Sequence, residues 1–233
     1  MNTMERILRL MHERHASDVF LSANSPAIIK IKGQCVPINS QALPPDAPRA
    51  LLAEILPPQR IEELEETGEL NMAHSLAGVG RFRISGMRQR GSYAVVIRCI
   101  NLDIPPLEQL NVPPVLGNLI MKKRGLLLMV GSTGAGKSTT LAAMIDHRNE
   151  RQAGHILTLE DPIEFLFRNK KSIINQREVG ADTASLQVGL KNALRQAPDV
   201  IMIGEIRDRE TMSAAVAYAQ SGHLCLATMH ANN

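Results

Sequence analysis

A nine-residue stretch, Gly131–Thr139, constrains this chain more than any other feature. It reads GSTGAGKST and fits the phosphate-loop pattern G-x-x-x-x-G-K-[ST]. A short apolar run at 126–130 precedes it and predicts one buried strand, and residues 139–147 follow with the spacing of a helix. This order aims backbone N–H groups and a helix N-terminus at an anion. The stretch therefore predicts an α/β fold built around a phosphate site.

The residue types of this loop suit a nucleotide with its metal ion. Glycine lets the backbone turn tightly and approach an anion closely. Lys137 can reach the β- and γ-phosphate oxygens, and the Ser138 hydroxyl can bind Mg²⁺ with Thr139 beside it. We therefore predict ATP and Mg²⁺ as cofactors, held by Gly131, Ser132, Thr133, Gly134, Ala135, Gly136, Lys137, Ser138 and Thr139.

Composition excludes several classes of protein. The 233 residues are 44% hydrophobic, which is enough for one large or two modest domains. The net charge of +3 and the lack of Trp argue against nucleic acid as a partner. No apolar run suggests a secretory leader or a transmembrane segment, so we expect a cytoplasmic protein. Three widely spaced cysteines predict free thiols: Cys35, Cys99 and Cys225.

Residues 1–100 read as one α+β domain. Apolar side chains at helical spacing predict an amphipathic first helix at 4–11. Glycines predict a turn at 86–91 between two strands. Further helices are expected at 47–56 and 59–66, and strands at 18–22, 27–32, 36–38 and over much of 70–100.

Prolines 105, 106, 113 and 114 predict an extended linker over 101–114. The remaining residues, 115–233, alternate between apolar runs and helical stretches. Such alternation predicts a mainly parallel sheet with helices on both faces. The runs lie at 126–130, 156–160, 200–203 and 224–228, and the helical stretches at 115–123, 139–147, 183–196 and 210–221.

Two groups of carboxylates follow predicted strands. Glu205 comes just after an apolar strand, where open α/β sheets bind ligands. We predict Glu205 as the general base, with a contact to Mg²⁺ through water, because the usual aspartate is absent from that strand end. Glu160 and Glu164 follow another strand and are predicted to act electrostatically at the phosphates, although a solvated turn is the alternative.

Histidines and arginines complete the candidate site. His230 follows the strand 224–228, where a γ-phosphate sensor would sit, and His223 precedes that strand and could equally be a core histidine. Charge on a transferring phosphoryl group is often met by an arginine from a neighbouring domain or subunit. Arg83 and Arg98 lie on predicted strands of the first domain, where a solvated basic face remains the alternative.

Together these motifs resemble the secretion ATPases that power type II secretion and type IV pili. The resemblance implies a RecA-like ATPase domain at 115–233 after a PAS-like domain at 1–100, in a homohexamer with nucleotide between the domains. It also implies a mostly helical region beyond residue 233. The matching motifs are Walker A at 131–139, the aspartate box at 158–165, an atypical Walker B at 199–208, the histidine box at 222–230, and the domain start at 16–22.

Residues 190–198 and 223–233 resemble the pilus retraction branch, and its accessory motors most of all. The resemblance implies an ATPase that drives pilus retraction in twitching motility at the cytoplasmic face of the inner membrane, with a platform protein and a primary retraction ATPase as partners. Pilus assembly, type II secretion and a nucleotide-dependent coupling subunit stay open as alternatives. The implied roles are phosphate and Mg²⁺ binding by Lys137 and Ser138, the base at Glu205, the aspartate-box carboxylate at Glu164, the sensor at His230 supported by His223, and phosphate contacts from Arg83 and Arg98.

Overall fold

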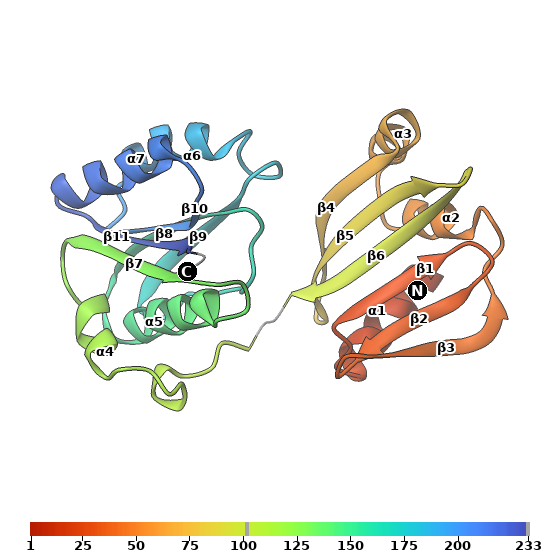
Figure 1. The fold of residues 1–233 in the computed structure, drawn as a ribbon, viewed down its shortest axis with the longest axis horizontal. Helices are drawn as coiled ribbons and strands as arrows, with labels where there is room; N and C mark the ends of the chain where they lie inside the picture. The colour runs from red at the N-terminus through yellow and green to blue at the C-terminus, as the bar shows by residue number, and fades with distance from the viewer. Residues whose placement is uncertain (101–102, 232–233) are drawn as a thin grey trace. The chain divides into compact units, whose positions relative to one another are not determined.

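A computed structural model describes residues 1–100 and 103–231. The chain forms two compact units, Met1–Asn101 and Leu102–Asn233 (Figure 1). Four residues lie outside the described part: 101 and 102, at the start of the predicted linker, and 232 and 233, after the histidine box. Among the described helices, none combines the length and apolar character needed to cross a membrane.

The first unit is a six-stranded antiparallel sheet with helices on one face. The strand order is β3-β2-β1-β6-β5-β4. Apolar side chains of alternate strand positions, such as Val19, Leu21, Phe82 and Ile84, form one core with the helices. The elements are α1 (Thr3–Glu13), β1 (Asp18–Ser22), β2 (Pro26–Ile31), β3 (Gln34–Ala42), α2 (Ala47–Ala53), α3 (Pro58–Thr67), β4 (Glu69–Leu76), β5 (Gly80–Gln89) and β6 (Ser92–Ile100).

The prediction of a turn at 86–91 is wrong about where the turn begins. Strand β5 runs through Gly86, and only Arg90 and Gly91 lie between β5 and β6. A Cβ atom at Gly86 would lie 3.3 Å from Leu52 and 3.4 Å from Leu64. This glycine therefore lets α2 and α3 pack closely on the strand, and it does not mark a chain reversal.

The described part of the proline-rich segment packs on the second unit. Leu107, in the short 3₁₀ helix η1 (Leu107–Gln109), is buried, and Ile104, Leu110 and Val112 lie against the same core. Apolar side chains spaced between the prolines anchor residues 104–112, so this stretch is not a free connector.

The second unit is a five-stranded parallel sheet in the order β7-β11-β10-β8-β9. Helices cover both faces, as Figure 1 shows. The elements are α4 (Val115–Ile120), β7 (Gly125–Gly131), α5 (Lys137–Arg151), β8 (Gly154–Glu160), β9 (Ser172–Glu178), α6 (Leu186–Ala193), the 3₁₀ helix η2 (Leu194–Gln196), β10 (Val200–Ile206), α7 (Arg209–Gln220) and β11 (Leu224–His230).

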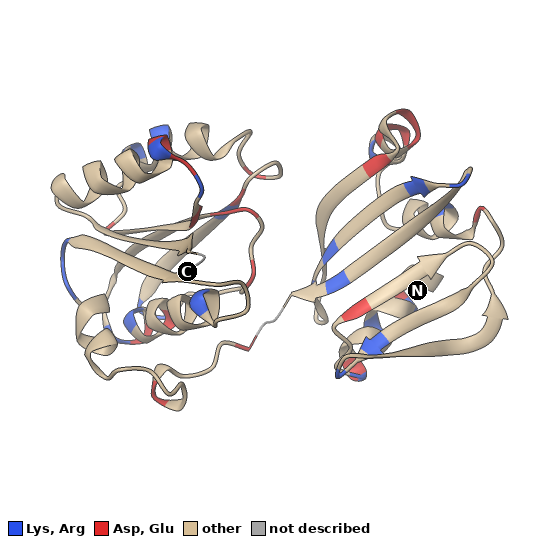
Figure 2. Ribbon diagram, in the orientation of Figure 1, with Lys and Arg blue, Asp and Glu red and all other residues tan. Residues whose placement is uncertain are grey.

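Strand alternation builds the two cores of this unit. On β10, Val200 and Met202 pack with α5, while Ile201 and Ile203 pack with α6 and α7. Both faces of the strand are thus apolar, as expected of a central parallel strand. In Figure 2 the strands of this unit are mostly tan, and charged residues lie near their ends and in the helices and loops. Charged side chains in the sheet are therefore found chiefly near the ends of its strands.

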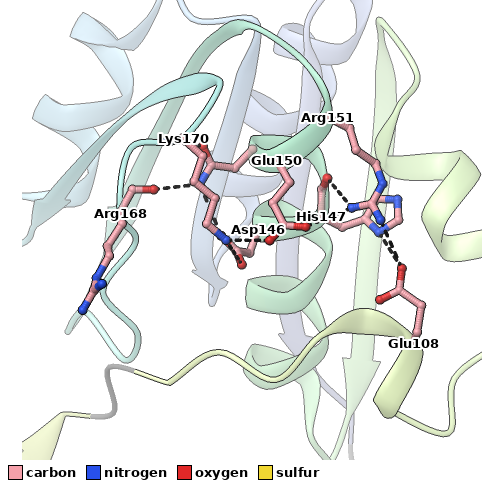
Figure 3. Close-up of polar contacts among 8 residues, drawn as sticks. Glu108, Asp146, His147, Glu150, Arg151, Arg168 and Lys170 are labelled. Atoms are coloured by element: carbon pink, nitrogen blue, oxygen red, sulfur yellow. Dashed lines mark hydrogen bonds and ion pairs between the residues drawn. The ribbon is translucent and has the colours of Figure 1, made fainter.

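The last turns of α5 are fastened to the segment that returns from β8 to β9. Asn149 is fully buried, and its side-chain amide donates to Arg168 O at 2.8 Å and accepts from Lys170 N at 3.1 Å. Figure 3 shows the Lys170 ammonium between two carboxylates of the same helix, 2.7 Å from Asp146 and 2.8 Å from Glu150. One helix therefore starts in the glycine-rich loop and ends bound to residues 168–170.

Candidate nucleotide site

The glycine-rich loop connects the end of β7 to the start of α5, as the sequence predicts. Gly134 and Gly136 have φ angles of 77° and 84°, a region that strains other residues. The Lys137 ammonium donates to the carbonyl oxygens of Gly131 and Ser132, each at 2.8 Å. These bonds place a positive charge inside the curve of the loop, at the N-terminus of a 15-residue helix. Both features attract anions.

A pocket of about 360 Å³ opens beside this loop. It lies at the carboxyl edge of the sheet, where β8, β10 and β11 end. The sequence-predicted residues that line it are Thr133, Gly134, Gly136, Lys137, Ser138, Thr139, Glu160, Glu164, Glu205 and His230. Four separate segments of the chain therefore meet at one cavity. Gly131, Ser132 and Ala135 belong to the loop without lining the cavity.

Glu205 is held between two basic side chains. One of its oxygens lies 2.7 Å from His230 Nε2, and the other is 2.5 Å from Arg207 Nε. Arg207 also lies 3.2 Å from Asp161. The hydrogen bond that Arg207 donates to Glu205 is the main cause that raises the pKa of the Arg207 guanidinium. A series of close polar contacts thus joins the ends of β8, β10 and β11 at the pocket.

Glu160 differs from the other carboxylates because it is buried, with 5% of its surface exposed. Its carboxylate accepts from Thr158 Oγ1 at 2.6 Å, Gln176 Nε2 at 3.1 Å and Glu164 N at 3.4 Å. Burial raises the pKa of the Glu160 carboxyl above its ordinary value of 4.5, although these hydrogen bonds oppose the shift. The hydrogen bonds of Glu160 therefore hold two neighbouring side chains and the backbone amide of Glu164 in place.

Glu164 lies in the β8–β9 loop, residues 161–171, and its side chain is exposed. Phe165 and Phe167 of the same loop line the pocket beside it. The loop therefore supplies a wall of the cavity, and it carries two carboxylates, Asp161 and Glu164, that line the pocket.

His223 and Asp199, which belong to the histidine box and the Walker B stretch, do not line this pocket. His223 precedes β11, whereas His230 ends it, so the seven-residue strand separates them by about 20 Å. His223 is bonded instead to Ser221 Oγ at 3.1 Å. Within one chain His223 cannot support His230. Asp199, the first residue of the Walker B stretch, is likewise at the amino edge, where it accepts from His155 N at 2.8 Å.

The predicted arginines are neighbours in the first unit. Arg83 on β5 lies directly opposite Arg98 on β6, and Arg98 forms an ion pair with buried Asp18 at 2.9 Å. Pairing two cations across a sheet is unfavourable, and Asp18 offsets part of that cost. Their contact with phosphate stays a prediction.

The pocket suits Mg²⁺ bound together with phosphates. Mg²⁺ prefers oxygen ligands and is usually held by one or two protein oxygens, water and substrate phosphate. The Ser138 hydroxyl and the Glu205 carboxylate line the same cavity. Among the described residues, no group of three or more His, Cys, Asp or Glu side chains could hold a metal ion by itself. The donor set therefore fits an ion that arrives with its nucleotide.

Residues 65–233 match the family model described as type II/IV secretion system protein. The chain belongs to this family. PilU, the type IV pilus ATPase of Pseudomonas aeruginosa, is 50% identical over 229 residues, which are 98% of this chain and 60% of PilU. PilT, the pilus retraction ATPase of the same organism, is 39% identical over 96% of this chain and 65% of PilT. The chain thus spans about 60% of the length of PilU.

Solved secretion ATPases share the fold. The crystal structure of the pilus retraction motor PilT with bound ADP has a TM-score of 0.93 and 41% identity, over the whole chain and 68% of that structure. These matches confirm the sequence-based resemblance and the α/β fold with its parallel sheet. The PAS-like character of the first unit and its functional boundary stay predictions.

The sequence did not indicate every residue that lines this pocket or holds its walls. Arg207 contacts Glu205 directly, and its place two residues after the predicted base was the available signal. Gln176 on β9 bonds to Glu160 and to the β8–β9 loop. No signal could have indicated this glutamine, because the sequence did not predict strand β9.

Proposed function

We propose that this chain is the catalytic part of an ATPase motor that drives type IV pilus retraction. One observation carries the proposal: the phosphate loop and the side chains of Glu164, Glu205 and His230 line a single pocket. A lone phosphate loop supports binding only, whereas hydrolysis also needs a positioned carboxylate. Here that carboxylate is Glu205, at the end of the strand β10.

The chain's own groups account for the chemistry. Lys137 leaves the two loop carbonyls for phosphate oxygens, and Ser138 takes a place beside the metal ion. Bound Mg²⁺ supplies neutralising charge at the β- and γ-phosphates. Water attacks the γ-phosphorus, its proton passes to Glu205, and the bond to the ADP oxygen breaks. His230, 2.7 Å from Glu205, is placed to respond to the γ-phosphate and to orient the base.

The motor assignment is supported by the relatives. Both PilU and PilT are named as type IV pilus ATPases, and PilT as a retraction motor. We place this chain with them, as a homohexamer at the cytoplasmic face of the inner membrane that acts on a platform protein. Its similarity to PilU supports an accessory motor that works beside a primary retraction ATPase. Arg83 and Arg98 are the proposed phosphate contacts from the first unit.

The substitution Glu205→Gln tests the role of Glu205 as the general base. The variant should bind ATP with unchanged affinity and lose hydrolysis by roughly 10²- to 10⁴-fold, because a glutamine amide cannot take the proton of the attacking water. Glu210→Gln is the matched control, since Glu210 is an exposed acid in the first turn of α7. Undiminished turnover in Glu205→Gln would remove this residue from the mechanism.

The direction of work needs a test in cells. Deletion of the gene should leave cells with excess pili that are not withdrawn, whereas loss of pili would indicate an assembly or secretion motor. A Lys137→Ala version expressed beside an intact primary motor should fail to support retraction. Full retraction with that version would mean that the chain couples or supports another motor without its own ATP turnover.

A further inference from the structure

The β8–β9 loop forms one wall of the pocket, yet the loop has no regular secondary structure over most of its length. It carries Glu164, Phe165 and Phe167 into the cavity lining. A catalytic group on such a segment works only if other residues fix the backbone that carries it. The groups that fix this backbone therefore matter to the chemistry as much as Glu164 itself.

Gln176, on strand β9, uses both ends of its amide on this loop. Its Nε2 donates to Phe165 O at 2.8 Å and to Glu160 Oε1 at 3.1 Å. Its Oε1 accepts from Phe167 N at 2.9 Å. One half-buried side chain thus holds the two backbone groups that flank residue 166 and also the carboxylate that ends β8. A glutamine has two N–H donors and one carbonyl acceptor, and all three are engaged.

Two carboxylates continue the same set of contacts. Glu160 accepts from Glu164 N at 3.4 Å, and buried Glu178, two residues beyond Gln176 on β9, accepts from Ile163 N at 3.2 Å. The backbone from 163 to 167 is therefore bonded at four points by side chains from the ends of two neighbouring strands. Gln176 is central because it bonds both to the loop and to Glu160, which in turn holds the amide of Glu164.

A purely structural role would require that the loop matter only for folding. The contacts argue otherwise, because they end on the amide of Glu164, on Phe165 O and on Phe167 N, and these residues line the phosphate pocket. The bonded set is thus located at the site, and Phe167 also connects it to a hydrophobic core of the unit.

We infer that Gln176 is a positioning residue, which holds the β8–β9 loop so that Glu164 stands at the phosphates. The inference rests on the proposed function for the role of Glu164. The positioning itself is a property of the loop and can be measured without turnover.

The test compares Gln176→Met with Asn175→Leu. Methionine conserves the length of the side chain and removes all three hydrogen bonds. Asn175, the preceding residue, is exposed and contacts His155 Nε2 at 3.0 Å, away from the loop. Amide exchange of Phe167 and Glu164, followed by NMR, should quicken at least about 5-fold in Gln176→Met, because the loss of one hydrogen bond is worth roughly that factor. The control should match the parent protein.

Catalysis supplies the second readout. In Gln176→Met we expect kcat for ATP to fall by roughly 10- to 100-fold with KM changed less than about 3-fold, since a displaced group loses transition-state contacts while the phosphate loop still binds. Gln176→Glu keeps an acceptor for Phe167 N and loses both donors. The kcat of Gln176→Glu should fall at least as far as that of Gln176→Met, because the new glutamate places a second carboxylate beside Glu160.

Each outcome decides the matter. Unchanged exchange at residues 164 and 167, or unchanged kcat, in Gln176→Met would overturn the inference. Faster exchange throughout the sheet, including Leu159 and Ile203, would show a residue needed for folding alone and would also overturn it. If the parent protein itself failed to hydrolyse ATP, the proposed function would fail, whereas the exchange comparison would still decide whether Gln176 holds the loop.

Discussion

Replacement of Asn149 with leucine should destabilise the second unit without a cavity, because the leucine side chain has as many heavy atoms as asparagine and the same branch at Cγ. The change removes three hydrogen bonds: to Arg168 O, from Lys170 N, and to Asp146 Oδ1 at 3.2 Å. It leaves two backbone groups of the β8–β9 loop without their partners. The backbone bond from Lys171 N to Asn149 O, 2.8 Å long, is unaffected.

The size of the effect follows from these contacts. A buried polar group left unpaired costs about 1–3 kcal/mol. Arg168 and Lys170 are exposed residues, so water reaches part of the freed backbone and the lower end of this range applies. Two such groups give a loss of about 2–3 kcal/mol in the free energy of unfolding, or roughly 5–10 °C in the melting temperature of a unit of this size.

Urea denaturation followed by far-UV circular dichroism measures this loss. Lys170→Met is the matched control, since it removes the two ion pairs shown in Figure 3 and keeps the backbone bonds. Those pairs are partly exposed, so the control should lose less than about 1 kcal/mol. Equal losses in the two variants would refute the argument, because surface charge would then account for the stability assigned to the buried amide.

Two further predictions concern ionisable groups. The folded chain favours the protonated form of Glu160, because burial raises its pKa; the free energy of unfolding should therefore fall as pH rises above 4.5 toward the folded-state pKa. Glu160→Gln should weaken that dependence in denaturation curves between about pH 5 and about pH 8, and parallel curves for the two proteins would assign the pH dependence to other groups. Iodoacetamide at neutral pH should label exposed Cys35 and spare Cys225 in the folded chain, since burial raises the pKa of the Cys225 thiol to about 12. Labelling of both thiols at similar rates, read by mass spectrometry, would mean that the sheet opens readily at β11.

The sequence predicted best where chemistry and strand ends coincide. The phosphate loop has an unusual composition at fixed spacing, and the runs that became β8, β10 and β11 are apolar on both faces. The C-terminal ends of parallel strands lie at the same side of a sheet. Acids and a histidine that follow these runs are therefore expected to lie close together. The sequence therefore predicts Glu164, Glu205 and His230 at one edge of the sheet, and the structure has all three in the lining of one pocket.

Other features depend on contacts that no local pattern indicates. Strand β9 alternates buried Ser172 and Ile174 with exposed Ile173, so its periodicity is short and mixed with polar residues. Gly86 resembles a turn residue until the helices packed over it are known. His223 resembles a partner of His230 because the two are close in sequence, yet a straight strand carries them to opposite edges of the sheet.

Helix α5 has a mechanical consequence. Its 15 residues span about 22 Å, from the glycine-rich loop at one end to Asn149 and Arg151 at the other. Arg151 lies 3.5 Å from Glu108 in η1 (Figure 3), so the far end touches both the β8–β9 loop and the segment that leads into the unit. A tilt of about 5° at the phosphate end would move these contacts by about 2 Å. A rigid-body tilt of this helix would therefore displace contacts that lie about 22 Å from the phosphate loop.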